Sequence, residues 1–183
     1  RDAALSLVRG VIKNQLRRFL SSSDQVFAEL PMEERRQAVA ELVQDGRLSL
    51  DEPVAALRTS LTLPGDAGRV TIADVLSHRV GLPHNAWDDR LEAGEDPKVL
   101  RAGFGGLPPA CPPGTCHAYQ NVAYDTASEI VELTTGRPYA DVARERLFAP
   151  LGMTSATIGR TGLENAASWA RPHHQGRRPA VVN

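Results

Sequence analysis

Apolar residues recur at intervals of three and four positions along most of this chain, and that spacing predicts helices. The first apolar stripe lies within residues 3–20, where cationic side chains accompany it. We expect this segment to pack on the domain or to form a leader, with contact to a membrane surface as the alternative. A second helix is predicted to begin at Pro31 and to stop at Gly46. Its buried positions are Ala38, Val39, Leu42 and Val43.

The middle and late parts of the chain predict four more helices. Thr71 and Asp74 resemble a capping box at the start of a short helix that ends at Gly81. Residues 88–102 predict a further helix, and two more precede and follow Gly136. The inward positions of these last two are Ala123, Ala127, Ile130 and Val131, and then Tyr139, Val142, Ala143 and Leu147.

Strong two-residue alternation is rare, so residues 54–63 and 156–159 are the only strand candidates. A chain of 183 residues can bury about two-thirds of its surface as one domain. The apolar content of 42% and the mean hydropathy of −0.28 indicate a soluble chain. The net charge of −1 gives no electrostatic reason to bind nucleic acid or acidic membranes. No apolar run is long enough to span a bilayer.

The candidate chemistry follows a Pro-Gly turn at residues 112–114. Tyr119 and Asn121 stand two positions apart, just ahead of a predicted helix. Residues i and i+2 of an extended backbone project from the same side, so we expect both side chains to face one cleft. The structural alternative makes Asn121 the N-cap of the helix and Tyr119 a half-buried core aromatic. His78 is expected to bond local backbone.

Tyr119-Gln120-Asn121 resembles the Tyr-x-Asn motif of the serine β-lactamase family, which includes class C β-lactamases, D-alanyl-D-alanine carboxypeptidases and related esterases. Four further segments follow the order of that family. They are residues 45–54 (DGRLSLDEPV), 70–83 (VTIADVLSHRVGLP), 136–139 (GRPY) and 150–153 (PLGM). In the second segment, Arg79 and Val80 replace the small hydroxyl residues of the family.

The resemblance implies an α+β fold, an antiparallel sheet with helices, of which this chain is expected to supply mainly the helical portion with few strands. Residues 1–28 do not match the family and are interpreted as an amphipathic helical segment and a Ser-rich linker. Residues 29–183 are interpreted as a partial β-lactamase-like domain.

The nucleophile of the family is a serine with a lysine three residues later, so that hydroxyl and ammonium share one helix face. The two lysines of this chain are Lys13 and Lys98, and no Ser-x-x-Lys occurs. Ser21 and Ser23 are the remaining nucleophile candidates, but Asp24 puts an acid where the base is needed. We interpret this serine cluster as a linker or helix cap.

Without that lysine, the resemblance implies a site that does not catalyse the reaction of the family. A phenol has a pKa near 10, so about one molecule in a thousand is phenolate at neutral pH. A neighbouring cation is needed to make Tyr119 a usable general base, and a serine without a base is a poor nucleophile. We therefore predict that this chain alone does not turn over substrate.

The third element of the family is Lys-Thr-Gly or His-x-Gly on a late strand. His174-Gln175-Gly176 fits the second form, but it follows Met153 by only 21 residues, too soon for that strand. We interpret it as part of a basic, proline-punctuated loop. His173 and His174 lack the further ligands of a metal site, so no metal and no cofactor are expected.

Cys111 and Cys116 enclose Pro-Pro-Gly-Thr, and a turn of this length is compatible with a disulfide. Such a bridge would stiffen the approach to Tyr119 and would indicate an oxidising compartment. Two unpaired thiols are the alternative. The expected location is therefore periplasmic or secreted, with a cytoplasmic location left open.

Two functions agree with these residues. In the first, the chain is part of a serine hydrolase that forms an acyl-enzyme on a β-lactam, a D-Ala-D-Ala peptide or an ester. Tyr119 would then shuttle the proton and Asn121 would orient the substrate. In the second, a non-catalytic homologue binds a peptide-like ligand or a protein partner. The expected partner is thus a small-molecule acyl substrate or a peptide-like ligand, and the oligomeric state is left open.

Overall fold

The computed structural model describes residues 30–65, 67–167, 173–174 and 178–179 of the 183-residue chain. The chain divides into two compact units, residues 1–34 and 35–183. Of the first unit, only the beginning of a helix that starts at Leu30 is described. The expectations for residues 1–28, including those for Ser21 and Ser23, lie outside the described residues.

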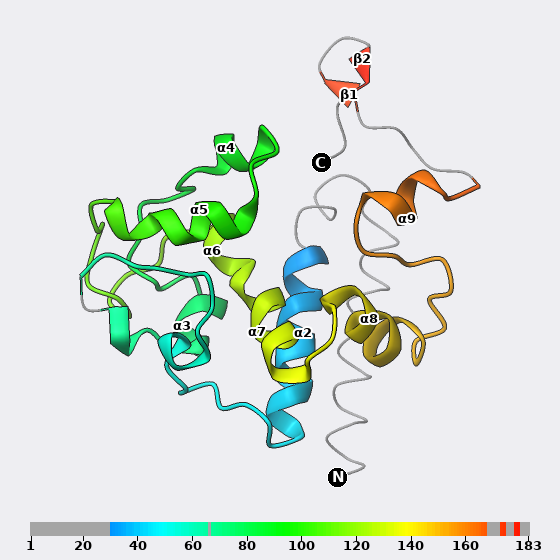
Figure 1. The fold of residues 1–183 in the computed structure, drawn as a ribbon, viewed down its shortest axis with the longest axis horizontal. Coiled ribbons are helices and arrows are strands. Elements are labelled where there is room, and N and C mark those ends of the chain that lie inside the picture. Colours follow the sequence, from blue (N-terminus) through cyan, green and yellow to red (C-terminus); the bar gives the residue numbers. More distant parts are fainter. Residues whose placement is uncertain (1–29, 66, 168–172, 175–177, 180–183) are drawn as a thin grey trace. The chain divides into compact units, whose positions relative to one another are not determined.

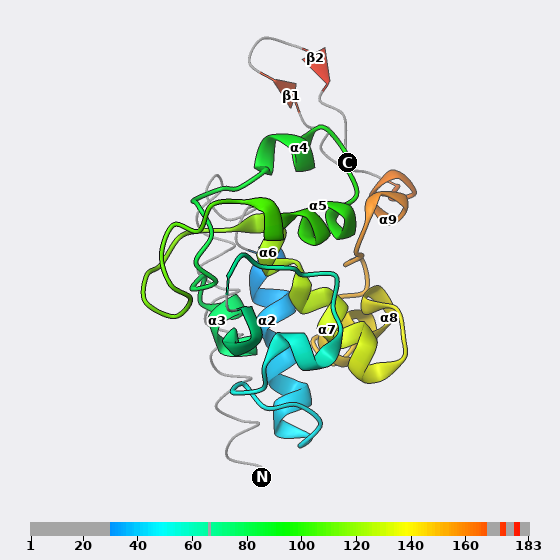
Figure 2. The same cartoon turned by 60° about the vertical axis from the view of Figure 1, so that its left-hand side comes forward.

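The second unit is built from short helices joined by loops, with helix α7 beside α8 and beside the part of α2 that belongs to this unit (Figures 1 and 2). The described elements are α2 (Leu30–Gln44), η1 (Val54–Leu57), η2 (Ala67–Arg69), α3 (Ile72–Leu76), α4 (Asp88–Glu92), α5 (Pro97–Gly103), η3 (Phe104–Gly106), α6 (Asn121–Tyr124), α7 (Thr126–Thr135), α8 (Tyr139–Ala143), η4 (Arg144–Phe148), α9 (Arg160–Glu164), β1 (His173–His174) and β2 (Arg178–Pro179). None of the described helices has the length and apolar content needed to cross a bilayer.

The described residues are mainly helical, as the apolar spacing predicts, but both strand predictions are wrong. Residues 54–63 open with the 3₁₀ helix η1, in which Val54 and Leu57 reach the core at the spacing of three that such a turn provides. Residues 156–159 have no regular structure. Among the described residues the sheet is limited to the antiparallel pair β1–β2, which occupies part of the predicted late loop.

Local signals set several helix ends. The side chain of Thr71 accepts from the Asp74 backbone N–H (3.2 Å) and the Asp74 carboxylate accepts from the Thr71 N–H (3.1 Å), which confirms the capping box. The helix ends at Leu76, before Gly81, because His78 has a left-handed backbone with φ of 56°. Gly136 closes α7 in the left-handed region, as predicted.

The helix predicted over residues 88–102 is two helices. Gly94 has a left-handed backbone, with φ of 88°, and interrupts the helix just after α4. Asp96 then caps α5, its carboxylate accepting from the Lys98 N–H (2.8 Å), with Pro97 in the first turn. The break lets α4 and α5 take different directions (Figure 1).

One hydrophobic core joins α2, α3 and α5–α8 of the second unit. Its members include the predicted inward positions of the helices on both sides of Gly136. Buried members from separate elements include Leu42, Ile72, Leu100, Phe104, Val122, Ile130, Tyr139 and Phe148.

A buried cation lies at the edge of this core. Arg101 of α5 exposes 1% of its side chain, and its guanidinium contacts Asp125 Oδ2 (2.6 Å), Glu129 Oε2 (3.2 Å) and Ser60 Oγ (2.9 Å). Glu129 also accepts from the backbone N–H (2.9 Å) and the hydroxyl (2.6 Å) of Ser60. Arg35 of α2 pairs with the second oxygen of Asp125 (2.8 Å). The network therefore connects α2, the loop before η2, α5 and the junction of α6 with α7.

Replacing Arg101 by methionine should destabilise the fold strongly, because it leaves two partly buried carboxylates without their shared cation. We expect a loss of about 3 kcal/mol in the free energy of unfolding, measured by urea denaturation. Arg137→Met is the matched control, since its pair with Glu145 is exposed and should contribute little. Equal urea midpoints for the two variants would contradict a central role for Arg101.

Gly103→Ala should also destabilise the fold. A Cβ at this position would lie 2.8 Å from Cη2 of Trp87, whose ring packs against Phe104 with centroids 4.9 Å apart. We expect a cost of about 1–3 kcal/mol from overpacking, measured by thermal and urea unfolding. Gly106→Ala is the control, because nothing lies within 4 Å of its added Cβ. A Gly103→Ala protein as stable as Gly106→Ala would show that the indole moves aside without cost.

Candidate functional site

The segment that carries Tyr119 and Asn121 is fixed to residues 78–85 by backbone hydrogen bonds. These bonds run along residues 110–119, so the two segments lie side by side over much of their length. The bonds, with the donor N–H first, are Ala110 to Gly81 (2.9 Å), Gly114 to Arg79 (2.7 Å), Ala118 to His78 (2.9 Å) and Asn85 to Tyr119 (2.9 Å).

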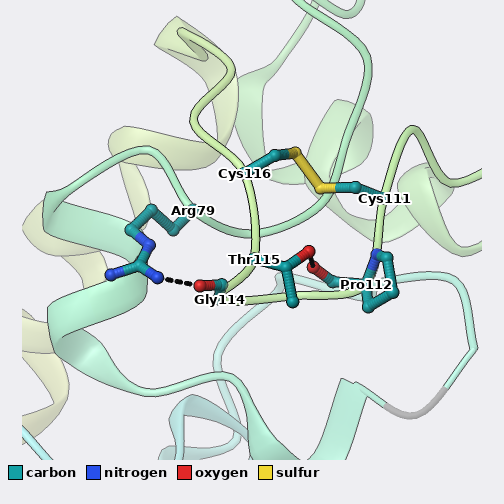
Figure 3. Close-up of a disulfide and its surroundings, with 6 residues drawn as sticks. All are labelled: Arg79, Cys111, Pro112, Gly114, Thr115 and Cys116. Carbon is teal, nitrogen blue, oxygen red and sulfur yellow. Dashed lines mark hydrogen bonds between the residues drawn. A yellow bond between two sulfur atoms is a disulfide. The ribbon is translucent and has the colours of Figure 1, made fainter.

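Cys111 and Cys116 form a disulfide within this segment, with Cα atoms 6.4 Å apart. The bridge was one of two alternatives open from the sequence. Figure 3 shows it closing the turn, with the Arg79 guanidinium donating to the Gly114 carbonyl. Gly81 lies against the same turn, where an added Cβ would stand 2.5 Å from the Cys111 carbonyl oxygen. The close approach of the two segments therefore requires glycine at position 81.

Tyr119 is partly buried among imidazole rings. Its ring stacks on His78 with centroids 4.7 Å apart and an interplanar angle of 29°. His84 lies beside it, at 6.3 Å and 37°. The phenol ring is thus half-buried and held against residues 78–84.

Asn121 is the first residue of α6 and not its N-cap, so the capping alternative is wrong. The N-cap is Gln120, whose side chain makes no capping hydrogen bond. The Asn121 amide nitrogen donates to Asp88 Oδ2 at 2.7 Å, which ties the start of α6 to the start of α4. Tyr119 and Asn121 therefore both contact the stretch from His78 to Asp88. A cleft shared by their functional groups stays a prediction.

Gln120, between these two residues, is fully buried. Its backbone N–H donates to Nδ1 of His78 at 3.2 Å. Neither polar atom of its side-chain amide has a hydrogen-bond partner among the described residues. The alternation of Tyr119, Gln120 and Asn121 thus sends the middle side chain inward.

The described ring neighbours of Tyr119 are the imidazoles of His78 and His84. Burial, and then the neighbouring imidazole of His117, lower the pKa of His78, so its ring is neutral at pH 7. Lys98, the one lysine in the part of the chain that the structure describes, contacts Glu132 at 3.7 Å. Nor do the described residues bring three His, Cys, Asp or Glu side chains together as a metal site would need. An inactive Tyr119 phenol in this chain therefore stays a prediction.

Sequence reasoning missed two contributors to this site. Asp88 pairs with Asn121 across 33 positions, and no local pattern connects them. His78 was expected to bond local backbone, whereas its side chain reaches Gln120, 42 positions away. For His78, the sequence offered one indication of a role in the site, which is its position within the 70–83 segment that resembles the family.

Comparison with known proteins identifies the family. The Beta-lactamase family model matches residues 37–183. An unguisins hydrolase of Aspergillus campestris is 32% identical over 114 residues, which are 61% of this chain and 21% of that protein. Penicillin-binding protein 4 of Amycolatopsis lactamdurans is 34% identical over 120 residues, 63% of this chain and 31% of that protein. The chain thus spans between a fifth and a third of the length of these relatives.

Solved structures agree on the fold. The octameric penicillin-binding protein homologue of Pyrococcus abyssi superposes with a TM-score of 0.70 at 22% identity, over 82% of this chain and 36% of that one. A D-stereospecific amidohydrolase of a Streptomyces species superposes with a TM-score of 0.58 at 25% identity. The match covers 66% of this chain and 40% of that one. Because the family model covers well over half of the chain, this protein belongs to the serine β-lactamase and penicillin-binding-protein family.

Proposed function

We propose that this chain is the helical portion of a serine hydrolase that acts on a small peptide-like substrate through an acyl-enzyme. Tyr119 and Asn121 are its contribution to the cleft. The observation that carries the proposal is the anchoring of both side chains on one stretch, Tyr119 on His78 and Asn121 on Asp88.

The roles follow from the hydrogen-bonding capacity of each group. The Asn121 nitrogen donates to Asp88, which leaves the amide oxygen to accept from an N–H of the substrate. The Tyr119 hydroxyl is the proton carrier between the nucleophile and the leaving group, once a cation beside it favours the phenolate. The stacking of Tyr119 on His78 fixes the direction of that hydroxyl.

The substrate class that we favour is an amide with a D-configured residue. This choice is supported by two similar proteins, a penicillin-binding protein and a D-stereospecific amidohydrolase. An ester remains the second choice. The Cys111–Cys116 disulfide supports an oxidising compartment, either periplasmic or secreted.

A second candidate function rests on a different observation, the absence of Ser-x-x-Lys from the 183 residues. Without a nucleophile and its base, the same residues describe a binding module. In that case the Asn121 oxygen and the Tyr119 hydroxyl would hold a peptide-like ligand that is not cleaved.

The first experiment asks whether the chain forms an acyl-enzyme. We expect no covalent adduct when the purified 183-residue protein is incubated with a fluorescent penicillin and analysed by mass spectrometry, and no hydrolysis of nitrocefin. The reason is that no serine in this sequence has a lysine three residues later. A stoichiometric penicilloyl adduct would contradict this prediction and would identify the nucleophile directly.

The second experiment measures ligand binding at Asn121. The probe is N-acetyl-D-alanyl-D-alanine, titrated into the protein by NMR. Asn121→Ala should weaken binding about five-fold, the effect of one lost hydrogen bond. Asn165→Ala, which removes an exposed amide just after α9, is the control. Identical affinities for these two variants would exclude Asn121 from the binding site.

A further inference from the structure

His78 contacts the Tyr119–Asn121 segment with both its backbone and its side chain. Its carbonyl oxygen accepts from the Ala118 N–H (2.9 Å), and its Nδ1 accepts from the Gln120 N–H (3.2 Å). Its ring stacks on Tyr119 (4.7 Å, 29°) and on Tyr124 (5.0 Å, 28°). One residue therefore holds three consecutive positions around the start of α6.

The backbone of His78 is itself fixed in an uncommon conformation. Its φ of 56° lies in the left-handed region, which few residues other than glycine adopt and in which Asn, Asp and His are enriched. Its N–H donates to Val75 O (3.2 Å) at the end of α3. In this conformation the imidazole reaches the Gln120 backbone N–H. Such a position persists only where the surrounding contacts determine it.

The hydrogen bond from Gln120 specifies the chemical state of the imidazole. A ring nitrogen that accepts carries no proton, so Nδ1 is unprotonated and the proton of the neutral ring is on Nε2. Protonation adds a proton at Nδ1, and this places two N–H donors against each other. The contact between His78 and Gln120 would change from attractive to repulsive.

We propose that His78 is a positioning residue that holds Tyr119-Gln120-Asn121 in place while its imidazole is neutral and releases this segment when the ring is protonated. The consequence, which rests on the proposed function, is that ligand binding by Tyr119 and Asn121 weakens in acid. The hydrogen bond and the two ring contacts are the observations that carry the proposal.

The groups around His78 agree with this direction. His117 of the 110–120 segment lies edge-on to the His78 ring, with the two ring centroids 5.7 Å apart. Tyr119 of the same segment and Tyr124 of α6 stack on the His78 ring. Asp74 of α3 is engaged by Thr71 in the capping box, and Asp88 of α4 by Asn121. The Arg79 guanidinium, next along the chain, donates to Gly114. Among the described residues the groups that act on the His78 charge are therefore its burial and His117, and both disfavour the charged form.

The sign of the pH effect follows. Burial and His117 lower the pKa of His78, so the unfolded chain takes up this proton before the folded one does. The stabilisation that requires the neutral ring is complete above the ordinary pKa of about 6.5 and falls as the pH drops below it. The segment should therefore be ordered at pH 7.5 and loosened in acid.

The test is an NMR titration of the ¹⁵N-labelled 183-residue protein from pH 8 to pH 4.5. At pH 8 we expect the His78 ring shifts of the Nε2–H tautomer and slow exchange of the Gln120 amide. As His78 titrates, the Gln120 amide shift should follow with the same midpoint, and its exchange should accelerate at least ten-fold beyond the intrinsic pH dependence. A Gln120 amide that stays protected while His78 titrates would overturn the proposal.

The matched variant is His78→Asn, whose side-chain oxygen can accept near the position of Nδ1, which tolerates φ above zero and which does not titrate. The Gln120 shift in this variant should be independent of pH. His117→Gln removes a neighbouring imidazole and should raise the midpoint without abolishing the transition. A pH response in His78→Asn equal to that of the unaltered protein would also overturn the proposal.

Ligand binding gives the second readout. The affinity for N-acetyl-D-alanyl-D-alanine, whose carboxylate stays ionised in this range, should fall about ten-fold between pH 7.5 and pH 5, and by less than two-fold in His78→Asn. If Asn121→Ala leaves the affinity unchanged, the proposed function fails, while the coupled titration of His78 and Gln120 still decides the positioning role. If the probe does not bind at all, the NMR titration decides it alone.

Discussion

The second unit depends on the buried guanidinium of Arg101. A cation that exposes 1% of its side chain is tolerated only when its hydrogen bonds and its charge are satisfied. Here Asp125, Glu129 and Ser60 provide those partners, two from the start of α7 and one from the loop before η2. The planar fork of arginine suits this arrangement, because each of its nitrogens meets a different oxygen.

This network and the His78 contacts act on opposite ends of one short element. Asp125 directly follows α6, whereas Gln120 directly precedes it. A four-residue helix has little stability of its own, so its position is set by what holds its ends. Asn121 is at the first turn of that helix, and its side chain is further restricted by Asp88. The placement of the candidate site is therefore a tertiary property, and the helix that carries it contributes little by itself.

Features that depend on neighbouring residues could be predicted from the sequence. The capping box at Thr71, the glycine that closes α7 and the apolar face around Ile130 are examples, because each arises within one or two helical turns. The burial of Arg101 could not be predicted, since a cation is normally solvated and its partners lie 24 to 41 positions away. The hydrogen bond from Asn121 to Asp88 could not be predicted either, because the two residues are 33 positions apart. The strand prediction for residues 54–63 was wrong because so short an apolar stretch holds too few residues to separate the two-residue period of a strand from the three-residue period of a 3₁₀ turn.

The Cys111–Cys116 ring has a consequence for the order of events during biosynthesis. Four residues separate the two cysteines, so under oxidising conditions the ring can close before any distant segment is available. The 183 residues contain these two cysteines, so oxidation within this stretch has a single outcome. By restricting the unfolded chain, a ring of this size adds about 2 kcal/mol to the free energy of unfolding. Early closure would give the chain a preformed bend around which residues 78–85 can later assemble.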